Sequence, residues 1–150
     1  MKHIDLVYEV FDKEDAESIY QLLVSAGEYE VQKVLLEDEI VSYLTSVNEE
    51  KTQLILSLNM AGFRAVGSDE NLLINSLPMN IVTVLTHKPE IYASYLERRM
   101  NYTISFLLLK NDVSDIREKY GHIYCVETID AYPDIIDYLK QLDWRFEGTR

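Results

Sequence analysis

Two apolar runs that each end at polar residues constrain the fold of this chain more than any other feature. One covers residues 53–59 (QLILSLN) and the other covers residues 81–86 (IVTVLT). Runs without regular polar alternation are typical of strands buried on both faces of a parallel sheet. In open α/β sheets, ligands bind outside the carboxyl ends of the strands. The two runs therefore predict a binding edge at Asn59 and Thr86.

Strand-like and helical patterns alternate along the whole chain. Apolar segments of strand length cover residues 4–10, 31–36, 53–59, 81–86, 103–109 and 123–127. Between them, apolar residues recur at three- and four-residue spacing, as they do on one face of a helix. These patterns predict helices after Asp12, across residues 40–47, after Ser68, and from Pro89, Asp112 and Pro133.

Regular alternation of strand and helix indicates right-handed βαβ units around a parallel sheet. We therefore expect a three-layer α/β fold with a mostly parallel sheet of five or six strands, Rossmann-like or flavodoxin-like. The chain has 150 residues, only five glycines and three prolines, and no stretch typical of a linker. Residues 1–150 are accordingly predicted to form a single α/β domain.

The charge of the chain excludes some partner classes. The net charge is −12, whereas binding to a nucleic-acid backbone requires clustered Lys and Arg. The apolar runs are far shorter than the roughly 20 residues of a membrane-spanning helix, and Asp5 lies where a signal peptide would be apolar. We expect a cytoplasmic protein that binds neither nucleic acid nor membrane.

Common catalytic and cofactor motifs are missing from the sequence. The turn at residues 11–15 (FDKED) has no glycine and carries three acids, which disfavours the phosphate loops of NAD, FAD, FMN and ATP sites. No nucleophile elbow is present, and Cys125 lies within an apolar run, where we expect it to be buried. No metal motif is formed by His3, His87 and His122. We therefore expect no cofactor, no metal and no catalytic residue.

Tyrosine is unusually frequent, with 11 residues. Seven of them lie in the second half of the chain, at positions 92, 95, 102, 120, 124, 132 and 138. A surface rich in tyrosine would suit a sugar or a protein partner, because the ring is apolar and the hydroxyl forms hydrogen bonds. The alternative is that these rings lie at the edge of the core with their hydroxyls in water.

The residues around the two runs resemble the N-terminal, Rossmann-like half of GT-B glycosyltransferases, particularly the spore-maturation type. Those proteins have a strand ending in an asparagine-bearing turn, like residues 58–63 (LNMAGF). A later strand ends before a polar residue and a proline, like residues 85–89 (LTHKP), and two further strands follow. The similarity covers about residues 50–130.

In such enzymes the N-terminal half holds the acceptor, and the C-terminal half holds the nucleotide sugar. The resemblance implies an acceptor-side domain that is not catalytic alone. It also implies a glycan or nucleotide-sugar ligand, and a second domain or a homodimer partner. The residues expected at the ligand site are Asn59, Gly62, Thr86, His87, Lys88 and Lys110. Gly62 would allow close approach of the backbone, His87 would act as a base or hydrogen-bond donor, and the lysines would hold an anionic group.

The same stretch also resembles the third strand of bacterial response-regulator receiver domains. Thr86 and Lys110 end strands where receivers keep Thr or Ser and Lys, and Asp12 corresponds to one of their metal-binding acids. The phosphoacceptor aspartate is matched by Asn59, which cannot be phosphorylated as a carboxylate is. This resemblance implies a phosphorylation-silent pseudo-receiver. A protein-interaction module that uses the tyrosine-rich half is the third alternative.

Overall fold

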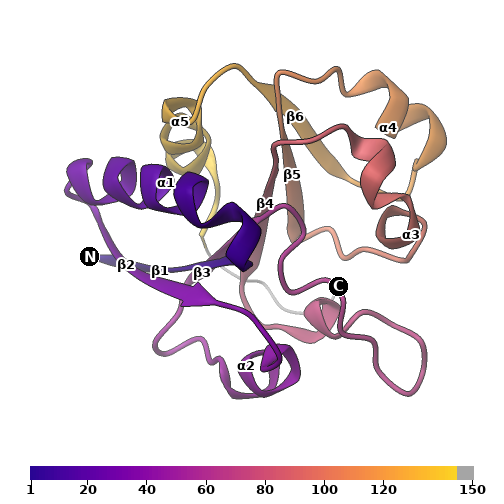
Figure 1. The fold of residues 1–150 in the computed structure, drawn as a ribbon, viewed down its shortest axis with the longest axis horizontal. Helices are drawn as coiled ribbons and strands as arrows, with labels where there is room; N and C mark the ends of the chain where they lie inside the picture. The colour runs from indigo at the N-terminus through magenta and orange to yellow at the C-terminus, as the bar shows by residue number, and fades with distance from the viewer. Residues whose placement is uncertain (145–150) are drawn as a thin grey trace.

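The computed structural model describes residues 1–144 and has a six-stranded sheet at its centre (Figure 1). The strands are β1 (Lys2–Tyr8), β2 (Tyr29–Leu35), β3 (Leu54–Leu58), β4 (Asn80–Leu85), β5 (Ile104–Leu109) and β6 (Cys125–Ile129). Their order is β2-β1-β3-β4-β5-β6, and every neighbouring pair is parallel. The predicted α/β fold with a parallel sheet is confirmed.

Helices cover both faces of this sheet (Figure 1). They are α1 (Lys13–Ser25), α2 (Ile40–Ser46), α3 (Ala93–Leu96), α4 (Ser114–Lys119) and α5 (Pro133–Gln141), with short 3₁₀ helices η1 (Val10–Asp12), η2 (Leu73–Ser76) and η3 (Pro89–Tyr92). Helices α1 and α5 pack on one face, and α2, α3 and α4 lie on the other. Within residues 1–144, no helix has the length and apolar character needed to cross a membrane.

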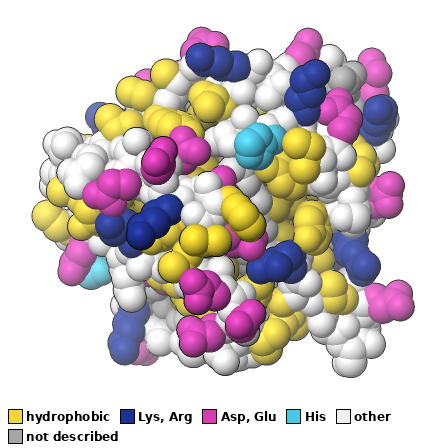
Figure 2. Space-filling view, viewed as in Figure 1, with side chains coloured by type: hydrophobic (Ala, Val, Ile, Leu, Met, Phe, Trp, Pro, Cys, Tyr) yellow, Lys and Arg dark blue, Asp and Glu magenta, His cyan; other side chains and the backbone are white. Residues whose placement is uncertain are grey.

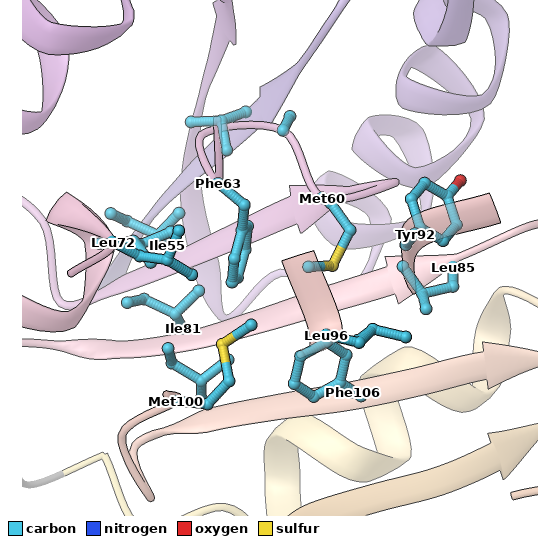
Figure 3. Packing of buried hydrophobic residues seen from close by; sticks show 14 of the residues in the cluster. Ile55, Met60, Phe63, Leu72, Ile81, Leu85, Tyr92, Leu96, Met100 and Phe106 are labelled. Atoms are coloured by element: carbon cyan, nitrogen blue, oxygen red, sulfur yellow. The ribbon is translucent and has the colours of Figure 1, made fainter. Parts of the chain in front are cut away.

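The two faces of the sheet support two separate hydrophobic clusters. Successive side chains of a strand point to opposite faces, so Leu6 joins the cluster beneath α1 and α5 while Val7 joins the other. In the second cluster the rings of Phe63 and Phe106 lie 6.3 Å apart (Figure 3). Every residue of β3 and β4 is buried, which explains why these two strands read as continuous apolar runs.

Helix ends follow local chemistry where the sequence signals are strong. Gly27 takes the left-handed conformation (φ 76°) behind α1, and its N–H donates to the carbonyl of Val24 at 3.1 Å. A glycine avoids the steric cost that a Cβ would bring at such a position. Pro133 begins α5, where a missing N–H leaves no helical hydrogen bond unmade.

The segment after Ser68 does not form the predicted α-helix. It pairs Val66 with Leu72 in an isolated antiparallel bridge and then makes only the single turn of η2. The backbone is already extended at Leu77 (ψ 143°). Pro78 disfavours a helical conformation for the residue before it, which limits this segment to one turn.

Three apolar residues within predicted strands or helices reach the surface. The first strand ends at Tyr8 rather than residue 10, and Val10 in η1 is 54% exposed. Ile91 is 66% exposed because η3 is a 3₁₀ turn with a different periodicity from an α-helix. Cys125 is exposed rather than buried, since β6 is an edge strand and lacks a neighbour on one side.

A buried carboxylate joins α2 to the sheet. Asp5 in β1 is 7% exposed, and its Oδ2 accepts hydrogen bonds from Tyr43 Oη at 2.7 Å and Thr52 Oγ1 at 3.0 Å. Burial and the bond to Asp5 raise the pKa of Tyr43 well above its ordinary value, so the tyrosine remains a donor. The three side chains therefore fix α2 and the start of β3 against β1.

Substitution of Asp5 by alanine is expected to lower the free energy of unfolding by about 2 kcal/mol, because two buried hydroxyls lose their acceptor. Urea denaturation measures this change. Tyr43→Phe serves as the partner variant, and the double variant should lose less than the sum of the single losses. Strict additivity would show that the Asp5–Tyr43 bond does not contribute to stability.

Candidate functional site

The backbone turns sharply where β3 ends, at the carboxyl edge of the sheet. Asn59 and Met60 both have positive φ (52° and 63°), a region that asparagine tolerates better than most residues. The N–H of Asn59 donates to Val84 O at 2.8 Å, and that of Met60 donates to Thr83 Oγ1 at 3.2 Å. The turn is thus held against β4, and the Asn59 side chain lies among the neighbouring loops.

The side chain of Asn59 links the exits of three strands. Its Nδ2 donates to Asp12 Oδ1 and to Thr86 Oγ1, both at 2.9 Å. Its Oδ1 accepts from the backbone N–H of Thr86 at 2.7 Å. We name the three residues Asp12, Asn59 and Thr86 the Asn59 bridge. It connects the loops after β1, β3 and β4 and fixes their relative positions.

Burial dominates the electrostatics of Asp12. It raises the carboxyl pKa above the ordinary value, while the hydrogen bond from Asn59 and the charge of His87 lower it in part. The neighbouring Asp15 raises it further by repulsion. Burial, with the charge of Asp12 as a smaller cause, also raises the pKa of Tyr92 to about 12. The carboxylate is therefore held at this edge against a desolvation cost.

This raised pKa predicts a pH-dependent effect for Asp12→Asn. An acid with a raised pKa in the folded state stabilises below its unfolded pKa and loses that contribution as pH rises. The variant should therefore be more stable than the wild type at neutral pH. The difference should vanish as pH falls below the ordinary carboxyl pKa of 3.8. Urea denaturation at neutral pH and below pH 3.8 measures this difference in stability. A variant that is less stable than the wild type at neutral pH would show that burial of the Asp12 charge is not destabilising.

Three predicted site residues lie exposed beside the bridge. His87 and Lys88 follow Thr86 directly and precede η3. Lys110 follows β5, the neighbour of β4, and is also exposed. Its φ is 58°, and its N–H donates to Ile129 O at 2.8 Å. The carboxyl edge thus carries the His87 imidazole, whose charge acts on the Asp12 carboxylate, and two exposed ammonium groups on the loops after β4 and β5.

Gly62 has a different environment from the other predicted site residues. It is buried, with φ 93°. A Cβ added to it would lie 3.7 Å from Ile74 Cδ1 and 3.8 Å from Leu36 Cδ1. The structure therefore brings Asn59 and Thr86 into direct contact and places Gly62 in the core layer behind them. Its conformation, which L-residues rarely adopt, accounts for a glycine here.

Hydrophobic side chains also reach the surface near this edge. Phe11 in η1 is 92% exposed, and Ile91 in η3 is 66% exposed. The electrostatic contacts of Asp12 with His87 and Tyr92 indicate that η1 and η3 are close to each other. Figure 2 shows hydrophobic side chains at the surface between acidic and basic ones rather than one uniform charged patch. These side chains offer apolar surface beside the polar groups of this edge.

The chemistry available at this edge is hydrogen bonding and charge pairing. Among the side chains that the structure describes, no group of three or more His, Cys, Asp or Glu is placed to hold a metal ion. No family model, curated protein or solved structure matches the chain. The function of the chain is therefore inferred from its geometry and from the resemblances given above.

The side-chain contact of Asp12 could not be predicted from the sequence pattern. It occupies the N-cap position of α1, as predicted, but its side chain makes no hydrogen bond to the helix. The carboxylate instead accepts from Asn59, which lies 47 residues further along the chain. The only indication in the sequence that Asp12 belongs to this edge is the group of acids directly after the first strand. The ion pair between Arg64 Nη2 and Glu9 Oε1, at 2.9 Å, was also not predicted by the sequence.

Proposed function

We propose that the chain is the acceptor-side domain of a GT-B-type glycosyltransferase and does not transfer a sugar alone. One observation carries this proposal: the Asn59 bridge holds Asp12 beside the exposed His87 at the carboxyl edge of a parallel sheet. This edge is where open α/β folds bind ligands. The proposal places the protein in the cytoplasm, with a second domain or a second copy completing the site.

The donors and acceptors at this edge suit the hydroxyl groups of a glycan. Asp12 Oδ1 accepts from Asn59, whereas the other carboxylate oxygen has no hydrogen-bond partner among the described side chains. That oxygen can accept from a sugar hydroxyl, and His87 and Lys88 can donate to one. The exposed ring of Phe11 adds an apolar surface nearby.

The acids at the exit of β1 favour an acceptor sugar over a nucleotide sugar. Glu9, Asp12 and Asp15 lie within seven residues of one another in the sequence. Their charge repels a diphosphate, which a nucleotide sugar carries and a neutral glycan does not. In this proposal Lys88 and Lys110 contact the outer part of the acceptor, away from Asp12.

Calorimetric titration of the full chain with neutral oligosaccharides and with nucleotide sugars tests the proposal. We expect saturable binding of at least one oligosaccharide and no comparable binding of nucleotide sugars. His87→Ala should weaken the binding about fivefold, because one typical hydrogen bond contributes about 1 kcal/mol to the binding free energy. His3→Ala is the matched control, because His3 lies at the start of β1, at the opposite edge. Binding of nucleotide sugars alone, or no binding at all, would overturn the proposal.

A pseudo-receiver is the second candidate, and the strand order favours it. The first five strands follow the order 2-1-3-4-5, which is one of the two common doubly-wound arrangements. Asn59, Thr86 and Lys110 each follow a successive strand of that sheet directly. In this case Asn59→Asp would restore an acceptor carboxylate, and acetyl phosphate with Mg²⁺ would phosphorylate the variant but not the wild type. The glycosyltransferase proposal expects no phosphorylation of either protein, as measured by intact mass.

A further inference from the structure

A hollow of about 340 Å³ opens at the amino edge of the sheet, opposite the Asn59 bridge. It is lined by Glu49, Thr52, Gln53, Pro78, Met79 and Trp144. Gln53 directly precedes β3 and Met79 directly precedes β4, so the hollow lies where these central strands begin. Its volume falls within the roughly 300–1,000 Å³ range of sites for small molecules.

Hydrogen bonds and ring contacts hold the walls of this hollow in place. Trp144 Nε1 donates to Leu139 O at 2.9 Å, and the indole stacks on Tyr29 with centroids 5.9 Å apart. Gln53 Oε1 accepts from the backbone N–H of His3 at 2.8 Å. The hollow is therefore formed before any ligand enters, which lowers the ordering cost of binding.

The lining of the hollow carries a single charged side chain. Glu49 is the one charged side chain among the lining residues, and within residues 1–144 it forms no ion pair. Thr52 already donates its hydroxyl proton to Asp5, so it can only accept. Met79 is 2% exposed, so the apolar surface of the lining comes mainly from Pro78 and Trp144, which are half-buried. One unpaired anion beside an apolar wall is complementary to a cation that carries an apolar body.

The indole of Trp144 already contacts one aromatic ring and one cation. Tyr29 stacks on the ring, and Lys2 Nζ lies 4.7 Å from its centroid. The Lys2 ammonium repels a second cation near the ring, so the charge of a cationic ligand is expected at Glu49. The net charge of −12 also favours the approach of a cation to an acidic site.

We propose that this hollow binds a small organic cation, with its ammonium group at Glu49 and its apolar body along Pro78 and Trp144. This site is separate from the carboxyl edge and does not depend on the glycosyltransferase proposal.

Trp144 makes the proposal directly measurable, because it is the only tryptophan of the chain. The probe is n-butylammonium, compared with n-butanol and butyrate, which share its apolar body and differ in charge. We expect n-butylammonium to change the tryptophan fluorescence and the indole N–H shift in NMR saturably. The alcohol should bind about fivefold more weakly, and butyrate should have no effect.

Two neighbouring acids provide the matched variants. Glu49→Gln should weaken n-butylammonium binding about fivefold. Glu50→Gln removes a charge from the next residue, which is exposed and does not line the hollow, and should leave binding unchanged. Both residues are exposed, so neither change should affect folding, and circular dichroism checks this. The proposal is overturned by equal affinities of the two variants, by equal binding of the alcohol and the amine, or by no saturable response in either signal.

Discussion

Replacement of Asn59 by alanine is expected to lower the free energy of unfolding by about 3 to 4 kcal/mol. The side chain makes hydrogen bonds to Asp12 Oδ1, Thr86 Oγ1 and Thr86 N, and each contributes about 1 kcal/mol. Alanine at φ 52° adds a left-handed backbone cost of about 1 kcal/mol. Urea denaturation measures the total change.

Asn59→Gly separates these two contributions. Glycine adopts the left-handed conformation without steric cost but lacks the amide, so it should be about 1 kcal/mol more stable than the alanine variant. The stability that the glycine variant still loses relative to the wild type is then the contribution of the hydrogen bonds of the Asn59 bridge. A glycine variant as stable as the wild type would show that the bridge does not stabilise the carboxyl edge.

Phe63→Ala is expected to cost about 4 kcal/mol, the typical value for removing a fully buried aromatic ring. Phe63 is 0% exposed and packs against Phe106 in the cluster that joins the sheet to the layer of α2 and α3 (Figure 3). The cavity left by the ring would lie within this cluster. The same urea experiment measures the loss.

Phe11→Ala is the matched control for this core substitution. Phe11 loses the same ring but is 92% exposed, so the change should stay within about 0.5 kcal/mol. Equal losses for the two variants would mean that burial of Phe63 is not what makes it stabilising. The control has a second use, since the glycosyltransferase proposal expects Phe11→Ala to weaken glycan binding without altering stability.

The central strands could be predicted because their sequence and their environment agree. β3 and β4 are buried along their whole length, and burial on both faces produces the continuous apolar runs by which they were recognised. The position of the carboxyl edge could be predicted as well, because parallel strands all end at the same edge of the sheet. Gly27 and Pro133 marked helix ends for local reasons that do not depend on tertiary contacts.

The features that the sequence did not predict depend on contacts between residues that are distant in the chain. Apolar neighbours suggested a buried Cys125, but the edge position of β6 exposes it. Asp12 satisfied the local rule for a helix cap, yet Asn59 provides a donor from another loop, and that competition cannot be seen in the sequence. The amino-edge hollow joins segments around residues 49–53, 78–79 and 144, which no sequence spacing relates.

The most direct test of the binding role assigned to the carboxyl edge is NMR mapping of the full chain during titration with neutral oligosaccharides. We predict that the amide signals of Asn59, Thr86, His87 and Lys88 shift together and saturate, while those of Gln53 and Trp144 at the amino edge remain unchanged. Shifts confined to the amino edge, or no shift at millimolar glycan, would contradict glycan binding at the carboxyl edge.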